Sequence, residues 1–139
     1  MIHIIDNIYL SNLRDASDLQ LIQKNNIKIV CRLSEDNNRS IYGPYVLFYN
    51  FEIEDNILYK KEIIEIAREI TDIARSTKNN VLIHCNEGQS RSPAVIIFYL
   101  IAMYECSYET AFEFVKAKKP DIKPNSAFVA ALKAFSDHR

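Results

Sequence analysis

The sequence predicts an α/β fold: a single layered domain with a short, mostly parallel central sheet flanked by helices. Three observations carry this prediction. Short β-branched segments alternate with helical patterns in the first part of the chain, and helical patterns alone follow Pro93. The 139 residues are the length of one domain, so we expect a single unit over 1–139. Hydrophobic residues make up 48% and charged residues 25%, as in folded globular proteins.

The first half is expected to hold four strands and one helix. Ile2–Ile5 and Ile8–Leu10 are short apolar segments around a polar turn, which is typical of a hairpin. Apolar residues at helical spacing predict a helix over Asp15–Lys24. Ile27–Leu33 is a β-branched strand, and Tyr45–Ile53 is strand-like. A polar loop, Ser34–Ser40, is expected between these last two strands.

The second half is expected to be mostly helical. Apolar residues on one face predict an amphipathic helix through Tyr59–Thr77. Val81–Ile83 is a short apolar strand, consistent with burial on both faces. The apolar run from Pro93 to Met103 is too long for a strand and predicts a buried helix. Two further helices are expected around 111–115 and 128–135. Aromatic residues at helical spacing are expected in the core: Phe98, Tyr99, Phe112, Phe114 and Phe128.

Charge and cysteine content limit the function classes. The net charge of −1 argues against a nucleic-acid partner held by bulk positive charge, although a local basic patch could hold one anion. No apolar stretch approaches a membrane span and no basic leader precedes one, so no membrane association is expected. The odd cysteine count predicts a reducing, cytoplasmic location. Cys31 is expected to be buried and Cys106 partly buried; a protective disulfide from either to Cys85 stays open.

The segment 81–93, VLIHCNEGQSRSP, carries the chemistry. A buried strand delivers Cys85 to its carboxyl end, where open α/β sheets bind ligands. A turn at Gly88 follows, and Pro93 is expected at the first helical position with Ser92 as the cap. The amides of the turn and of the helix N-terminus would then converge on one point, which suits a phosphate dianion.

The side chains of this segment fit the same chemistry. Arg91 offers two donors to two phosphate oxygens, which lysine cannot reproduce. The positive field favours the thiolate form of Cys85, which is the nucleophile. Ser92 could donate a hydrogen bond to the sulfur, and His84 is expected to orient the loop. A lone cysteine or arginine would be unremarkable, but this order after a buried strand favours an active site. The expected phosphate-binding residues are Asn86, Glu87, Gly88, Gln89, Ser90 and Arg91.

The pattern HCNEGQSRSP at 84–93 matches the signature loop of the cysteine-dependent protein tyrosine phosphatases, and in its fuller form it resembles the dual-specificity phosphatases. Residues 6–11 and 27–33 resemble that family's first strands, and 119–125, KPDIKPN, resembles a segment behind its signature loop. The resemblance implies a metal-independent phosphatase that acts on phosphotyrosine and phosphoserine or phosphothreonine in proteins. It implies that Cys85 attacks phosphorus, Arg91 holds the phosphoryl oxygens, Ser92 assists hydrolysis and Asn125 supports the loop.

Asp55 is the expected general acid. It lies 30 residues before Cys85, which is where the dual-specificity phosphatases place theirs. Breaking a phosphate ester requires protonation of a poor leaving group. The alternative is that Asp55 caps the following helix. The other carboxylates that could serve are Glu54, Glu52 and Asp36, and strand alternation puts the first two on one solvated face.

Departures from the family pattern leave other functions open. Glu87 stands where the family has a small residue, and a carboxylate there would weaken anion binding, which suggests a weakly active phosphate-binding module. RNA 5′-phosphate and phospholipid remain open as substrates. The loop lacks the residues typical of family members that act on either of them. The histidines have no ligand spacing, so neither metal nor cofactor is expected. The partners expected are phosphorylated proteins, with the chain a monomer or homodimer.

Overall fold

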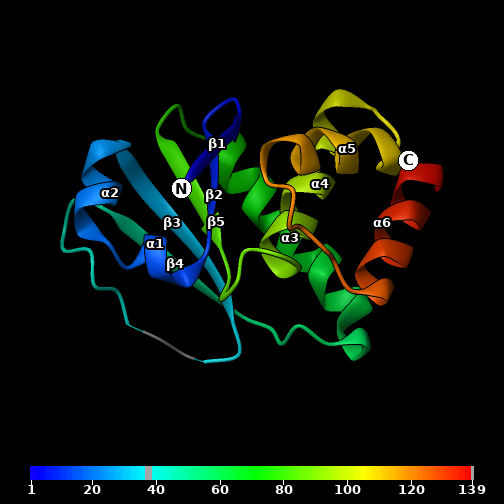
Figure 1. The fold of residues 1–139 in the computed structure, drawn as a ribbon, viewed down its shortest axis with the longest axis horizontal. Coiled ribbons are helices and arrows are strands. Elements are labelled where there is room, and N and C mark those ends of the chain that lie inside the picture. Colours follow the sequence, from blue (N-terminus) through cyan, green and yellow to red (C-terminus); the bar gives the residue numbers. More distant parts are fainter. Residues whose placement is uncertain (37–38, 139) are drawn as a thin grey trace.

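The computed structural model describes residues 1–36 and 39–138. A five-stranded sheet lies between two helical layers (Figure 1). The strands are ordered β1-β2-β5-β3-β4. The pair β1–β2 is antiparallel and the other neighbours are parallel, which confirms the predicted mostly parallel sheet. The strand bounds are β1 Ile2–Ile5, β2 Ile8–Ser11, β3 Ile27–Ser34, β4 Leu47–Glu52 and β5 Asn80–His84.

The helices cover both faces of the sheet. The short α1 and α2 lie against one face, and α3 to α6 gather on the other (Figure 1). No helix within the described ranges has the length and apolar content needed to cross a bilayer. The bounds are α1 Leu13–Ala16, α2 Leu19–Lys24, the 3-10 helix η1 Ile57–Tyr59, α3 Lys60–Arg75, α4 Arg91–Tyr104, α5 Tyr108–Lys118 and α6 Ser126–His138.

The alternation of side chains along β3 and β5 creates two apolar layers. Val30 and Leu82 point towards α1 and α2, where they pack with Ile22. Their neighbours Cys31 and Ile83 point to the opposite face and join the larger core. Because β5 is covered on both sides, its apolar run has no polar face, as the sequence predicted.

The predicted helix over Asp15–Lys24 is wrong in one respect, because two short helices replace it. The chain leaves the helix at Ser17 and restarts at Asp18, whose Oδ1 accepts hydrogen bonds from the N–H groups of Gln20 and Leu21. An aspartate that caps a new helix competes with continuation of the old one. The expected loop 34–40 begins one residue later, since Ser34 ends β3, and the next strand begins only at Leu47; residues 37–38 lie outside the described residues.

Most of the expected core residues are buried. Phe98, Tyr99 and Phe128 are buried and Phe112 is partly buried. Phe114 is 39% exposed, so its predicted core position is wrong. It lies on the outer face of α5, where the Lys118 ammonium sits 4.9 Å from its ring centroid.

Cys31, Cys85 and Cys106 form no disulfide bond within the described residues. Cys31 is fully buried in β3, and burial raises the pKa of its thiol to about 12, so it stays neutral and unreactive. Cys106 lies between α4 and α5 and is partly buried, as predicted.

Candidate active site

The nucleophile candidate lies at the carboxyl end of the middle strand. β5 runs parallel to both of its neighbours, β2 and β3, and Cys85 is the first residue after it. The thiol is 3% exposed. Three parallel strands therefore end at one edge of the sheet, which is where ligands bind in open α/β folds.

Helix α4 begins earlier than the sequence predicted. Arg91 is its first residue and Ser90 precedes it, so Pro93 is the third helical residue and Ser92 is not the cap. Proline is tolerated there because the first N–H groups of a helix have no carbonyl partner within it. The Ser92 hydroxyl is instead 3.1 Å from the Cys85 sulfur, which is the contact predicted for it. Both side chains are buried.

Gly88 allows the loop to pass close to the end of β2. Its φ is +70°, and a Cβ there would lie 3.0 Å from the backbone oxygen of Ser11. The same approach is fixed by a 2.9 Å hydrogen bond from the Leu13 N–H to the Asn86 carbonyl. Any larger residue would be strained and would move the loop.

Arg91 is buried with one donor unused. Its Nη1 donates to Oε2 of Glu35 at 2.6 Å and to the carbonyl of Ile53 at 2.9 Å. Its Nε is buried and has no hydrogen-bond partner among the described residues. A buried guanidinium donor without a partner is unfavourable. An oxyanion bound in the loop would satisfy it.

Glu35 is the site residue that sequence reasoning missed. It follows β3, the strand beside β5, and its Oε1 also lies 3.4 Å from Nδ2 of Asn86. The Arg91 hydrogen bond lowers the pKa of the Glu35 carboxyl, which is therefore ionised at neutral pH. A signal was present, because a carboxylate directly after a parallel neighbour of β5 must lie at the same sheet edge.

We expect Glu35→Gln to bind inorganic phosphate about threefold more tightly than the wild type. The amide keeps an oxygen acceptor for Arg91 but removes a negative charge that opposes the bound dianion. The measurement is the inhibition constant for phosphate. Glu54→Gln is the matched control, because it removes an exposed carboxylate that lines the same 160 Å³ cavity as Glu35. Weaker phosphate binding by Glu35→Gln would contradict the expectation.

Asp55 is held at the mouth of the site. Its Oδ1 accepts a hydrogen bond from the Ser90 hydroxyl at 2.6 Å and another from Nδ2 of Asn125 at 2.9 Å. The alternative that Asp55 caps the following helix is wrong, because Asn56 caps η1 through its Oδ1. Since Ser90 donates its hydroxyl proton to Asp55, any contribution of Ser90 to phosphate binding would come from its backbone.

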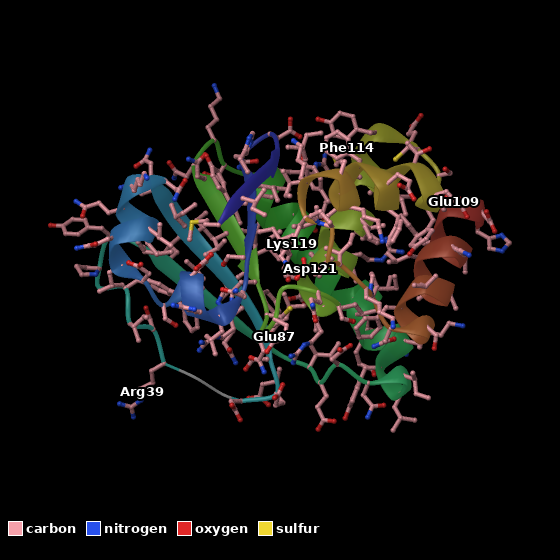
Figure 2. All side chains as sticks on the ribbon, viewed as in Figure 1. Arg39, Glu87, Glu109, Phe114, Lys119 and Asp121 are labelled. Carbon is pink, nitrogen blue, oxygen red and sulfur yellow. The ribbon has the colours of Figure 1, made fainter. Side chains whose placement is uncertain are left out.

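The segment 119–125 lies behind the loop, as the resemblance implied. The Lys123 N–H donates to the Gln89 carbonyl at 2.5 Å, and the Asn125 N–H donates to the Ser90 hydroxyl at 3.0 Å. Nε2 of Gln89 lies 3.3 Å from the Asp121 carboxylate, which is paired with Lys119 at 2.6 Å. Figure 2 labels these two charged residues, which lie together. This ion pair lowers the pKa of the Asp121 carboxyl.

Of the other predicted carboxylates, Glu52, Glu54 and Glu87 are exposed. Because Glu87 is exposed, its charge is screened by solvent. Over residues 1–36 and 39–138, no group of three or more His, Cys, Asp or Glu side chains is placed to hold a metal ion.

His84 is fully buried and its Nδ1 lies 3.2 Å from the carbonyl of Cys85. Burial lowers the pKa of its imidazole to about 4, so the ring is neutral at pH 7. A neutral ring bonded to the loop backbone fits the predicted orienting role.

The buried His84 makes folding stability depend on pH. Its folded pKa lies below the unfolded value of about 6.5, so the unfolded state binds the extra proton first as the pH falls. We expect the free energy of unfolding to decrease by about 2 kcal/mol between pH 7 and pH 4.5. Urea unfolding at both pH values measures this change in the free energy of unfolding. His84→Gln should remove this part of the pH dependence, and His138→Gln, at an exposed position, should keep it. An equal pH dependence in all three proteins would contradict the assignment.

Known proteins are similar to this chain over most of its length. The sequence profile of the family described as dual specificity phosphatase, catalytic domain, matches residues 8–138. Protein phosphatase Slingshot of Drosophila melanogaster is 31% identical over 96% of the chain, and human dual specificity protein phosphatase 16 is 30% identical over 93%. The chain spans only 13% and 20% of the length of these two relatives.

Solved structures share the fold. The crystal structure of human tyrosine phosphatase-like serine/threonine/tyrosine-interacting protein superposes with a TM-score of 0.84 and 26% sequence identity. That comparison covers 99% of this chain and 96% of the other. The relation therefore extends over the whole domain and is not limited to the loop.

Proposed function

The chain belongs to the dual specificity phosphatase catalytic domain family, and from this premise we propose that it hydrolyses phosphate monoesters on protein side chains through a cysteinyl-phosphate intermediate. The observation that carries the proposal is the arrangement around Cys85. The Ser92 hydroxyl touches the sulfur and Arg91 offers a buried, unused donor. Asp55 is fixed to the same loop through Ser90.

In the first step the Cys85 thiolate attacks phosphorus. The S–P bond forms as the P–O bond to the leaving group breaks, and Asp55 gives its proton to the departing oxygen. Arg91 and the loop amides hold the three remaining phosphoryl oxygens, where charge is present throughout the transfer. Glu35 and the Ile53 carbonyl fix the guanidinium by occupying Nη1.

In the second step water attacks the cysteinyl phosphate. The Asp55 carboxylate, now ionised, takes a proton from the water. The S–P bond breaks and the electron pair returns to Cys85, where the Ser92 hydroxyl donates to the developing thiolate. Inorganic phosphate leaves and both groups regain their starting protonation states.

Phosphorylated proteins are the proposed substrates, as the names of the protein phosphatase relatives suggest. The alternative of a phosphate-binding module is favoured by one comparison, since a structural relative is named phosphatase-like. Two observations favour turnover here. The chain keeps Cys85, Arg91 and Asp55, and the unusual Glu87 is exposed.

Metal-free hydrolysis tests the proposal. The purified chain is given an aryl phosphate in the presence of a chelator, and then matched phosphotyrosine and phosphothreonine peptides. We expect turnover of the aryl phosphate and of both peptides. Binding of the peptides without turnover would replace the enzyme by a binding module. Turnover of the aryl phosphate alone would contradict a protein substrate and direct the search to RNA 5′-phosphate and phospholipid.

A further inference from the structure

The strand β4 forms one edge of the sheet. It pairs with β3 on one side, and no other strand of the described residues lies on its opposite side. Its register with β3 runs without a bulge from Leu47 to Glu52. An unpaired edge presents a row of backbone N–H and C=O groups that can pair with another strand. This edge of the sheet is therefore open to one further strand.

The side chains along this edge are apolar and exposed. Tyr45 is 85% exposed, Leu47 is 58% exposed and Tyr49 is 39% exposed. No charged residue lies between Ser40 and Phe51. Edge strands are commonly protected from pairing by charged side chains, by proline or by a bulge, and the residues 47–51 carry none of these devices. Exposed apolar side chains gathered at an unprotected edge mark an interaction surface.

The edge is complementary to itself. A two-fold axis perpendicular to the sheet pairs the β4 strands of two copies antiparallel. With the axis at Tyr49, this side chain lies opposite its own copy, and Leu47 lies opposite Phe51. The three side chains share one face of the strand, where the rings of Tyr49 and Phe51 stack with their centroids 6.4 Å apart. A charged partner segment would find no opposite charge along these residues, whereas a second copy matches them.

Charge does not oppose the pairing of two copies. The net charge of the chain is −1, so two copies repel each other weakly. Glu52 is the charged residue of β4, and in this register it lies opposite Val46, at the end of the paired segment. The two Glu52 carboxylates are then roughly 20 Å apart along the strands, which is beyond the Debye length at physiological salt.

We infer that this edge is a homodimer interface, in which the β4 strands of two copies pair antiparallel about Tyr49 and join the two sheets into one. The inference goes beyond the proposed function and does not depend on it. Because β3 separates β5 from β4, Cys85 lies outside the interface and both active sites stay open.

The test places charges at the residue on the axis. Tyr49→Lys and Tyr49→Glu each bring two like charges together, so the dissociation constant of each variant should rise about tenfold. An equimolar mixture of the two variants should dimerise again, because the introduced charges then attract each other. Sedimentation equilibrium with a reductant present measures the dissociation constants, and far-UV circular dichroism checks that each variant is folded. Phe114→Lys is the matched control; Phe114 is also 39% exposed but lies on α5, so this variant should dimerise like the wild type.

A second measurement needs no variant. Amide hydrogen exchange at residues 47–51 should slow as the concentration of the wild type is raised, while exchange in β1, at the opposite edge of the sheet, should not change. A wild type that stays monomeric up to about 500 µM would overturn the inference. Tyr49 variants that keep the dimer, or a mixture that does not restore it, would overturn it as well. The proposed phosphatase function stands in each of these cases.

Discussion

Cys85→Ser is expected to lower the hydrolysis of an aryl phosphate by about 10⁴-fold or more. A serine hydroxyl is barely ionised at neutral pH, so the site loses its nucleophile while its shape is kept. The serine oxygen can still accept a hydrogen bond from Ser92, which touches the sulfur in the wild type at 3.1 Å. Steady-state kinetics with a chelator present measures the loss.

The same variant should still bind phosphate. Arg91 and the loop amides are untouched, so the inhibition constant for inorganic phosphate should change little. The matched control is Cys31→Ser. The Cys31 thiol is fully buried in β3, and its raised pKa keeps it protonated and unreactive. The control variant should lower stability and keep kcat. Substantial turnover by Cys85→Ser would contradict a cysteine nucleophile.

Arg91→Lys is expected to reduce kcat/KM by about 10²–10³-fold. Lysine keeps the charge but lacks the planar donors. Its ammonium can replace Nη1 towards Glu35 and the Ile53 carbonyl, but it has no second nitrogen at the position of Nε. The phosphoryl oxygens would then lose the paired hydrogen bonds that grow stronger in the transition state.

This loss should appear in both binding and turnover. The inhibition constant for phosphate should rise with KM, and kcat should fall as well, because the guanidinium contacts the transferring group. Arg68→Lys is the matched control; Arg68 of α3 lies over the rings of Phe98 on α4 and Phe135 on α6, outside the described site. An Arg91→Lys enzyme that loses only stability, with kcat/KM preserved, would contradict the assigned role.

The sheet and the long helices could be predicted because their signals are local. Period-2 and period-3.6 patterns determine which face is buried, and β5 and α4 lie within a few residues of their expected bounds. Helix starts depend on competing side-chain hydrogen bonds, which a pattern does not contain. Asp18 therefore divides one expected helix into two, and Ser90 replaces Ser92 as the residue before α4.

The site could be predicted where it lies on one continuous segment. Cys85, Arg91 and Ser92 lie within eight consecutive residues, so their spacing shows in the sequence. Contacts between distant segments cannot be predicted from spacing in the sequence. Glu35 reaches Arg91 across 56 positions, and Asn125 reaches Asp55 across 70. Both depend on which strands are neighbours and on how α6 packs, which follow from the whole fold.

Detection of phosphate on the Cys85 sulfur tests the central claim most directly. Wild type and Ser92→Ala are mixed with an aryl phosphate, quenched in alkaline denaturant within the first turnovers and analysed, without exposure to acid, by mass spectrometry of the peptide that contains residue 85. We expect one phosphoryl group on Cys85, with more of it in Ser92→Ala, because the serine hydroxyl helps the sulfur to leave. Hydrolysis that proceeds with no phosphorylated cysteine in either protein, or with phosphate on another residue, would contradict the account.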